Sequence, residues 1–545
     1  MVEELPDGYY LDNFDYLLEF VSRQYAHLLD KDELAYAANF HDLPVQARML
    51  YVRLVQRKGP LFRCDKIAYK EITDLQAAIQ HLSEAGFLDD GHDAELAEVL
   101  CLLTKDELLE LPEAAKAESS WKKSAILENL IDANVKVIIT AFCVLRPLHQ
   151  DFFQLYKLLF FGNLTQDLTE FVLNDLGVTP FEKYPLQADA SFFESRGFIE
   201  ETRQLYRLNE LSHDIVSESD PDAMAEFIQL LPERCRNDRL GRRHDRIVNR
   251  IARQYERLGA LGDALLLYSG TMSPPSRERR ARILQKENRL EECIEQCIEM
   301  LQNPDTDQEL EVATRFLHRF RKKDSLAHMI PALDMEILEF KPVLHSVCTQ
   351  NMPGKRVEEV ARDWFEHQGG EAYYVENSLL PGLFGLAFWD IIFTPVKGAF
   401  FNPFQRGPAD MFSPEFYQKR RELIENRFVE LGDRERLRNL ICTHFVEKYP
   451  TANHFVHWPN LTQELLERFL SVLSIESLLA VFRRLLADPK GNRSGFPDLV
   501  VFQYGSYRLV EVKGPGDRLQ ENQLRWLRHF SSVGIPAEVV HISWK

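Results

Sequence analysis

Two runs, Gly495-Phe496-Pro497-Asp498-Leu499-Val500-Val501-Phe502 and Tyr507-Arg508-Leu509-Val510-Glu511-Val512-Lys513-Gly514, decide the fold of the C-terminal part of this chain. Both runs are rich in β-branched and apolar residues, and Gln503-Tyr504-Gly505-Ser506 between them has the composition of a tight turn. They therefore predict a β-hairpin. A helix from about Leu519 to Phe530 and a short apolar strand from Ala537 to Ile542 are expected after it.

Three charged residues of the hairpin are expected on one face. Residues two apart in a strand point to the same side, so Glu511 and Lys513 project together, and Asp498 on the neighbouring strand can meet them. Charges on a face that should be apolar are costly unless a divalent cation bound by carboxylates compensates them. Carboxylate oxygens suit Mg²⁺ or Mn²⁺, so the hairpin predicts a metal site. The alternative interpretation is a surface ion pair on an edge strand.

The composition of the whole chain is that of a soluble globular protein. A length of 545 residues predicts three or four domains at about 150 residues each, or a helical array with a catalytic unit. Apolar residues make up 45% and charged residues 27%, which excludes disordered and collagen-like chains. The N-terminus lacks a signal-peptide pattern, and the most apolar run, Leu379 to Phe393, is too short to span a membrane. We therefore expect a cytoplasmic protein.

Eight cysteines in so long a chain are too few for a disulfide scaffold. Cys293 and Cys297 lie four apart, and no CxxC pair has a partner pair. Structural zinc is therefore not expected.

The net charge of −19 (65 basic against 84 acidic residues) argues against nucleic-acid binding unless positive charge is concentrated locally. Such a concentration occurs at residues 231–289, where fifteen Arg or Lys stand against seven Asp or Glu, a local sum of +8. Arg243, Arg246, Arg250, Arg253 and Arg257 recur at three- and four-residue spacing and share one helix face. A solvated helix face is the alternative. The candidate phosphate-binding residues are Arg242, Arg243, Arg246, Arg250, Lys122 and Lys123.

The chain is expected to be mostly α-helical ahead of the hairpin. Apolar residues at three- and four-residue spacing predict a helical domain over residues 1–90, with a basic turn that could face DNA. Residues 91–140 resemble a SAP module, a small helical DNA-binding unit, and Thr104 is expected to cap one of its helices. Residues 141–345 predict paired helices like those of a TPR array. Residues 346–545 form the predicted catalytic domain.

Pro-Asp on one strand and Glu-x-Lys on the next resemble the core of the PD-(D/E)xK nucleases. Gln523-Leu524-Arg525-Trp526 resembles the Q-x-x-W element of that superfamily, and the run from Asn492 to Pro515 is similar to its VRR-NUC branch. Glu376 followed by Trp389-Asp390-Ile391-Ile392-Phe393 is similar to the Fanconi-associated nucleases, and the absence of a zinc-finger cysteine pattern indicates a bacterial-type member.

That resemblance implies a site and an activity. The implied metal ligands are the carboxylates of Glu376, Asp498 and Glu511 with the carbonyl of Val512, and the implied catalytic residues are Asp498, Glu511, Lys513 and Gln523. Glu376 has an alternative role, since it is expected near a helix start, where an acidic residue stabilises the helix dipole. Arg242 lies in Gly241-Arg242-Arg243-His244-Asp245-Arg246, which resembles an element of the family that binds a 5′-terminal phosphate.

The implied function is structure-specific hydrolysis of DNA with one or two Mg²⁺ or Mn²⁺ ions. Such an enzyme is a 5′-flap endonuclease with 5′-to-3′ exonuclease activity that acts on branched duplex DNA in repair, for example of interstrand crosslinks. A nucleoid-associated location follows from that substrate. Two alternatives remain: a nuclease of the Holliday-junction resolvase kind, and a TPR-like adaptor without catalysis.

Overall fold

The predicted hairpin is present in the computed structural model, which describes residues 8–111, 120–132, 143–168, 171, 180–186, 192–323, 325–350, 352 and 354–545. Strands β6 (Leu499–Gln503) and β7 (Ser506–Lys513) pair antiparallel, with Val500 opposite Leu509. Tyr504 and Gly505 in the turn have φ of 53° and 76°. Two successive positive φ angles match the twist of a two-residue hairpin turn, which explains the local sequence.

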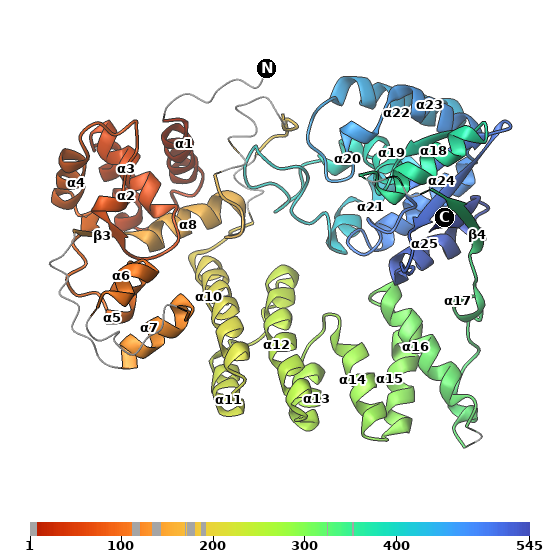
Figure 1. Cartoon of the computed structure of the whole chain (residues 1–545), viewed down its shortest axis with the longest axis horizontal. Helices are drawn as coiled ribbons and strands as arrows, with labels where there is room; N and C mark the ends of the chain where they lie inside the picture. The colour runs from red at the N-terminus through yellow and green to blue at the C-terminus, as the bar shows by residue number, and fades with distance from the viewer. Residues whose placement is uncertain are drawn as a thin grey trace. The chain divides into compact units, whose positions relative to one another are not determined.

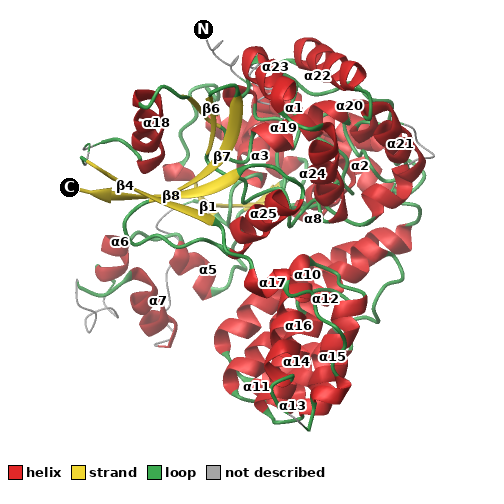
Figure 2. Ribbon diagram, turned by 90° about the vertical axis from the view of Figure 1, so that its right-hand side faces the viewer, coloured by secondary structure: helices red, strands yellow, loops and turns green. Residues whose placement is uncertain are grey.

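This hairpin is the centre of a five-stranded sheet in the order β4-β8-β7-β6-β5. The outer members are β4 (Val343–Thr349), β5 (Glu371–Tyr374) and β8 (Ala537–Trp544). One face of the sheet packs on α18 (Val357–His367) through a core that includes Val510 and Phe365. The other face packs on helices that include α24 (Ile475–Ala487) and α25 (Glu521–Ser532). Figure 2 shows these helices on opposite sides of the yellow sheet.

Further helices surround the second face of the sheet. They bury the aromatic and aliphatic side chains of the apolar run that begins at Leu379, which is core as its composition predicts. These helices are α19 (Leu379–Ala387), α20 (Trp389–Ile392), α21 (Glu415–Leu431), α22 (Arg434–Lys448) and α23 (Gln463–Val472). Across the described residues, no helix is both long enough and apolar enough to cross a membrane.

An array of consecutive helices precedes the sheet, shown in yellow to green in Figure 1. Neighbours along the chain pack on one another in two apolar cores, one centred on Ile251 and the other on Ile294. Its helices are α10 (Arg196–Glu218), α11 (Pro221–Leu230), α12 (Asp238–Leu258), α13 (Leu261–Ser269), α14 (Ser276–Lys286), α15 (Leu290–Gln302), α16 (Asp307–Phe320) and α17 (Glu336–Glu339). Consecutive helices are therefore present from Arg196 onward, whereas the residues up to Pro180 that were expected in the same array belong to the first compact unit.

Residues 1–180 with 186–196 form one compact unit, and residues 181–185 with 197–545 form a second. The helices among the described residues of the first unit are α1 (Tyr9–Gln24), α2 (Lys31–His41), α3 (Val45–Val55), α4 (Leu75–Glu84), α5 (Leu96–Cys101), α6 (Lys105–Leu109), α7 (Lys123–Asp132) and α8 (Gln150–Phe161). Thr104 caps α6, because its side chain accepts the N–H of Glu107 at 3.3 Å, as expected.

The first unit also contains a small sheet that the helical periodicity did not predict. Its strands β1 (Phe62–Arg63), β2 (Leu88–Asp89) and β3 (Val144–Pro147) join in the order β1-β3-β2. The β1–β3 register continues to Cys64 and Cys143, which form a disulfide with their Cα atoms 5.4 Å apart. Strands of two to four residues are too short to show a period of two, which is why sequence patterning misses them.

Candidate active site

The strand register places Asp498 opposite Glu511. In the β6–β7 ladder Leu499 pairs with Val510, so the next pair of positions in the same register is Asp498 and Glu511. The backbone stays extended there, because the Val375 N–H donates to the Asp498 carbonyl at 2.8 Å and continues the ladder with β5. Both carboxylates are thus expected on the face that carries Val500 and Leu509 and meets α25. The sequence-predicted pair is brought together as its alternation implied.

Asp498 is bound to the end of β7 through the backbone. Its Oδ2 accepts the N–H of Val512 at 2.8 Å. Val512 lies beyond the part of β7 that pairs with β6, so the Asp498 side chain takes the place of a backbone acceptor for this N–H. A residue in an antiparallel ladder presents its N–H and C=O to the same neighbour. The Val512 carbonyl therefore faces the Asp498 side, where the resemblance puts it as a ligand.

Glu511 is held by two donors on one of its oxygens. Its Oε1 accepts the Gln523 amide at 2.6 Å and lies 2.9 Å from the Lys513 ammonium. Gln523 is fixed in turn, because its own Oε1 accepts the Gln520 N–H at 2.9 Å in the capping box of α25. The helix cap thereby orients the carboxylate.

Burial perturbs both carboxylates. Glu511 is 2% exposed and Asp498 is 7% exposed. Burial, opposed by the Val512 N–H and increased by the charges of Glu376 and Glu358, raises the pKa of Asp498 to about 6. Burial and the neighbouring Asp498, opposed by Lys513, raise the pKa of Glu511 to about 8. Neither carboxyl group ionises readily, because each is buried and lies beside the other. The negative charge of the ionised pair is therefore balanced by a bound cation, or one carboxyl group keeps its proton.

Glu376 stands in the turn between β5 and α19 and is exposed. The helix start expected near Glu376 lies three residues further on, because α19 starts at Leu379 and Asn377 has a φ of 49°. The Glu376 carboxylate accepts hydrogen bonds from the Tyr374 hydroxyl and from the Asn377 amide. The helix-dipole alternative therefore does not account for its position, since its oxygens are bonded to side chains.

The donor chemistry of the pair fits a divalent cation. Among the described residues, one oxygen of each buried carboxylate is hydrogen-bonded, which leaves Asp498 Oδ1 and Glu511 Oε2 without such a bond. No set of three or more His, Cys, Asp or Glu side chains within the described ranges is gathered closely enough to form a metal cage by itself. Two free carboxylate oxygens and a backbone carbonyl are nevertheless the hard ligands that Mg²⁺ or Mn²⁺ accepts.

Sequence reasoning missed the residues that support the loop before Asp498. The Asn377 Oδ1 accepts the N–H groups of Gly495 at 2.9 Å and Phe496 at 3.2 Å. Gly495 has a φ of 96°, and a side chain there would meet the Asn522 backbone carbon at 2.9 Å. Trp526 is buried and packs against Phe496, with ring centroids 4.1 Å apart and the rings tilted by 32°. The sequence signal for this support was Asn377, directly after Glu376.

Most candidate phosphate-binding arginines already have partners. Arg242 lies 2.8 Å from the Glu415 carboxylate of α21. Arg243 donates to the Tyr206 hydroxyl at 2.6 Å and stacks on that ring. Arg250 donates to Asn209 and Ser212 of α10.

The remaining cations differ in exposure. Arg246 is exposed, and among the described residues its guanidinium has no ion pair and bonds only the Arg242 carbonyl. Lys122 is exposed, whereas the Lys123 ammonium donates to the Cys101 carbonyl at 3.0 Å. Arg246 and Lys122 are therefore the candidates most available to a phosphate.

Asp245 in the same element is structural. It is fully buried and accepts both a bidentate pair from Arg234 and the Ser273 hydroxyl, the latter at 2.6 Å. Against the effect of burial, these bonds and one from His244 lower the pKa of Asp245 to about 2. Gly241 leaves room for Arg234, because a side chain there would lie 2.7 Å from its guanidinium.

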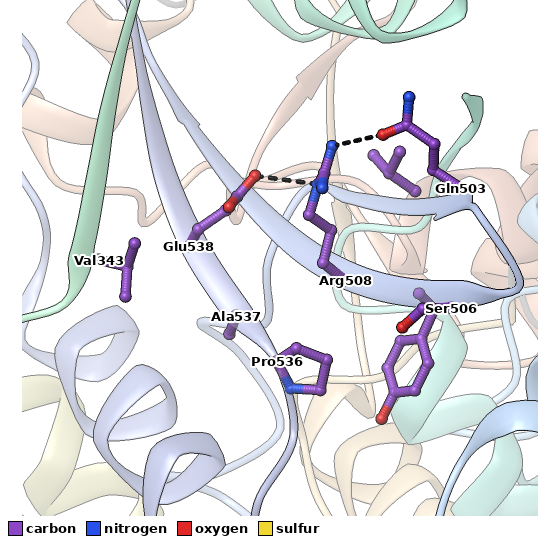
Figure 3. Close-up of a pocket in the computed structure, with 9 residues that line it drawn as sticks. Val343, Gln503, Ser506, Arg508, Pro536, Ala537 and Glu538 are labelled. Carbon is purple, nitrogen blue, oxygen red and sulfur yellow. Dashed lines mark hydrogen bonds and ion pairs between the residues drawn. The ribbon is translucent and has the colours of Figure 1, made fainter. Parts of the chain in front are cut away.

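A pocket of about 360 Å³ lies at the opposite end of the sheet from these carboxylates. It is lined by the first residues of β7 and β8, and Figure 3 shows Arg508 between Glu538 and Gln503. The Arg508 guanidinium is 3.1 Å from Glu538 and donates to Gln503 at 3.0 Å. Its charge is already balanced, so the pocket adds nothing to the carboxylate site.

Comparison with known proteins identifies two regions of the chain. The family model described as the FAN1, HTH domain matches residues 8–89, and the VRR-NUC domain matches residues 433–544. The Fanconi-associated nuclease 1 homolog of Pseudomonas aeruginosa is 35% identical over 565 residues, which cover 99% of this chain and 97% of that protein. Human Fanconi-associated nuclease 1 is 27% identical over 98% of this chain but only 62% of its own length.

Solved structures agree with the sequence matches. The crystal structure of paFAN1 bound to 2-nucleotide 5′-flap DNA with a gap matches with a TM-score of 0.87 at 35% identity, over 100% of both chains. The complex of paFAN1 with 1-nucleotide 5′-flap DNA with a gap matches with a TM-score of 0.85 at 34% identity. The similarity therefore extends over both units and not only over the catalytic sheet.

Proposed function

This chain belongs to the Fanconi-associated nuclease 1 family, and on that premise we propose that its carboxylate site makes it a 5′-flap endonuclease with 5′-to-3′ exonuclease activity. It is a metal-dependent, structure-specific DNA nuclease of DNA repair. Its substrate is branched or flapped duplex DNA, as in interstrand crosslink repair, and it acts at the bacterial nucleoid. The observation that carries the proposal is the buried Asp498–Glu511 pair with Lys513 and Gln523.

The chain's own residues divide the work of phosphodiester hydrolysis. Asp498, Glu511, the Val512 carbonyl and Glu376 would hold one or two Mg²⁺ or Mn²⁺ ions. Such an ion, when bound, neutralises charge on the scissile phosphate and lowers the pKa of attacking water. Lys513 is 2.9 Å from Glu511 and is positioned to orient that water or to stabilise the developing oxyanion. Gln523 fixes the Glu511 carboxylate, which keeps its second oxygen directed to the site.

DNA binding is assigned to the parts of the chain that precede the catalytic domain in sequence. We assign it to the helical region 1–90 and the SAP-like region 91–140, with Lys122, and to the array over 141–345, with Arg246. Arg242, Arg243 and Arg250 are assigned to DNA binding by the array, and Lys123 to DNA binding by the SAP-like region. Their present partners would have to yield to phosphate. Residues 346–545 supply the chemistry.

A cleavage assay tests the proposal. End-labelled 5′-flap, 3′-flap and Holliday-junction substrates are incubated with the protein in Mg²⁺, Mn²⁺ or EDTA. Cleavage of the 5′-flap with either metal and none in EDTA is expected. Preferred cleavage of the junction would favour the resolvase alternative, and no cleavage of any substrate by the folded protein would favour the adaptor. The flap-bound complexes of paFAN1 favour the first outcome.

A further inference from the structure

The last long helix of the array, α16, meets the catalytic helix α25 through a row of ion pairs. Both helices are labelled in Figure 1. Asp307, Glu311 and Arg315 are spaced four residues apart and so share one face of α16. The Glu311 carboxylate is 3.2 Å from Arg525 and 3.1 Å from Arg528, and Arg315 is 2.7 Å from Glu521. Asp307 pairs with Arg484 of α24, whose guanidinium also lies 5.3 Å from the Trp526 ring centroid.

Glu311 is the central residue of this contact. It is 3% exposed, and it bridges two guanidinium groups of α25 that lie one turn apart. Removing one partner from a buried ion pair leaves an uncompensated charge, which is far more disruptive than the loss of a surface pair. Without Glu311, Arg525 and Arg528 would repel each other beneath α16 and would have to turn toward solvent.

The opposite face of α25 carries the site. Trp526 and Phe530 pack on the catalytic sheet, and Gln523 donates to Glu511 at 2.6 Å. A rotation or shift of α25 therefore moves the amide that fixes a carboxylate. The helix is held on one side by Glu311 and acts on the site from the other.

We propose that Glu311 is a positioning residue for hydrolysis, because its bridge to Arg525 and Arg528 fixes α25 in the orientation that lets Gln523 hold Glu511. This rests on the proposed nuclease function of the same site. The array thereby contributes to catalysis through α25, in addition to any contact it makes with DNA. Glu311 touches no reacting atom, so its effect passes through Gln523.

The chain offers a matched control on the same helix. Glu309 is 1% exposed and pairs with Arg277 of α14, at 2.6 Å, so it braces the array and not α25. Glu311→Gln and Glu309→Gln each remove one buried charge from α16. Glu311→Gln is expected to lower kcat on a 5′-flap substrate about tenfold with KM unchanged, as for residues that orient a metal ligand. Glu309→Gln should leave both parameters near those of the wild type. A tenfold loss in both variants would overturn the proposal, because it would reflect general loss of array stability.

Two further measurements separate this inference from the proposed function. Binding of Mn²⁺ alone, followed by titration calorimetry without DNA, should weaken in Glu311→Gln and stay unchanged in Glu309→Gln. Mn²⁺ binding is measured without cleavage, so it tests the positioning role of Glu311 by itself. A wild-type protein that cleaves no substrate would refute only the proposed nuclease activity. Unchanged Mn²⁺ affinity in Glu311→Gln would refute the positioning role. Arg525→Gln removes one of the two pairs and should give a smaller shift in the same direction, which keeps the test valid if Glu311→Gln folds poorly.

A double-mutant cycle tests the path through Gln523. If Glu311 acts through this amide, Gln523→Ala and Glu311→Gln together should lower kcat little further than Gln523→Ala alone. Multiplying effects would show that Glu311 acts elsewhere and would overturn the proposal.

Discussion

Replacing Asp498 with Asn should stabilise the metal-free protein at neutral pH while it abolishes hydrolysis. Asn keeps an oxygen that can accept the Val512 N–H, so the backbone contact survives. It removes a buried negative charge that lies beside Glu511 and that burial already disfavours. The residue is thus expected to be retained for chemistry at a cost in stability.

The magnitude follows from the raised pKa. Raising the pKa of Asp498 from 3.8 to about 6 means that the folded protein holds this proton more tightly than the unfolded chain. The free energy of unfolding is therefore greatest at pH values below 3.8, the pKa in the unfolded chain, and falls as the pH rises toward about 6. Two units at about 1.4 kcal/mol each correspond to about 3 kcal/mol. The Asn variant avoids this loss, so its advantage should be near zero at about pH 4 and about 3 kcal/mol at pH 8.

Urea unfolding in EDTA measures this difference. Five of the six tryptophans, Trp364, Trp389, Trp458, Trp526 and Trp544, lie at or after α18, so intrinsic fluorescence reports mainly on the second unit. Transitions of wild type and variant are compared at pH 4.5 and pH 8. Added Mn²⁺ should stabilise the wild type and not the variant, because binding to the folded state alone shifts the equilibrium.

Asp245→Asn is the control, because its expected effect on stability at pH 8 is opposite in sign to that of Asp498→Asn. Hydrogen bonds from Arg234 and Ser273 outweigh burial and lower the pKa of Asp245 to about 2, so its charge stabilises the fold above pH 4. This variant should lose about 2 to 3 kcal/mol at pH 8. If Asp498→Asn were less stable than wild type at pH 8, or if its advantage did not change with pH, the argument from burial would be refuted.

Three further changes test other parts of the site. Lys513→Ala should reduce flap cleavage more than about 100-fold while DNA affinity, measured by fluorescence anisotropy in EDTA, stays unchanged; substantial residual cleavage would contradict its assignment. Arg246→Glu should weaken flap binding and reduce the slope of log affinity against log salt concentration by about 1 to 2. An unchanged slope would show that Arg246 does not contact phosphate and lies on a solvated helix face. Gly495→Ala should lose about 1 to 3 kcal/mol and most of its cleavage activity, because the position needs a positive φ and contacts the Asn522 backbone; normal urea stability would contradict this.

Local sequence patterns predicted the catalytic hairpin, because a hairpin is formed by residues that are close together in the chain. Alternation in a strand put Glu511 and Lys513 on one face, and the turn residues Tyr504 and Gly505 fixed where the two strands reverse. The paired helices of the array followed from three- and four-residue spacing. The short strands β1, β2 and β3 were missed because two to four residues carry no period.

The electrostatic state of the arginine-rich helix depends on partners that periodicity cannot reveal. Arg242, Arg243, Arg246 and Arg250 have the same residue type and similar spacing, yet one is exposed and three are bound by residues of α10 or α21. Glu415, which pairs with Arg242, lies 173 residues away in sequence. A local charge sum of +8 therefore overstates the positive charge available to DNA.

The sequence by itself determined the catalytic hairpin, the pairing of carboxylates with a lysine and the kinship to a nuclease family, because these reside in contiguous motifs, whereas strands β4 and β5 of the same sheet were not predicted. Only the tertiary structure decided how the motifs are held. It placed Asn377 under the loop before Asp498 and Glu311 against the helix that carries Gln523. These contacts join residues more than 100 positions apart, and their existence depends on burial and orientation that no local pattern encodes.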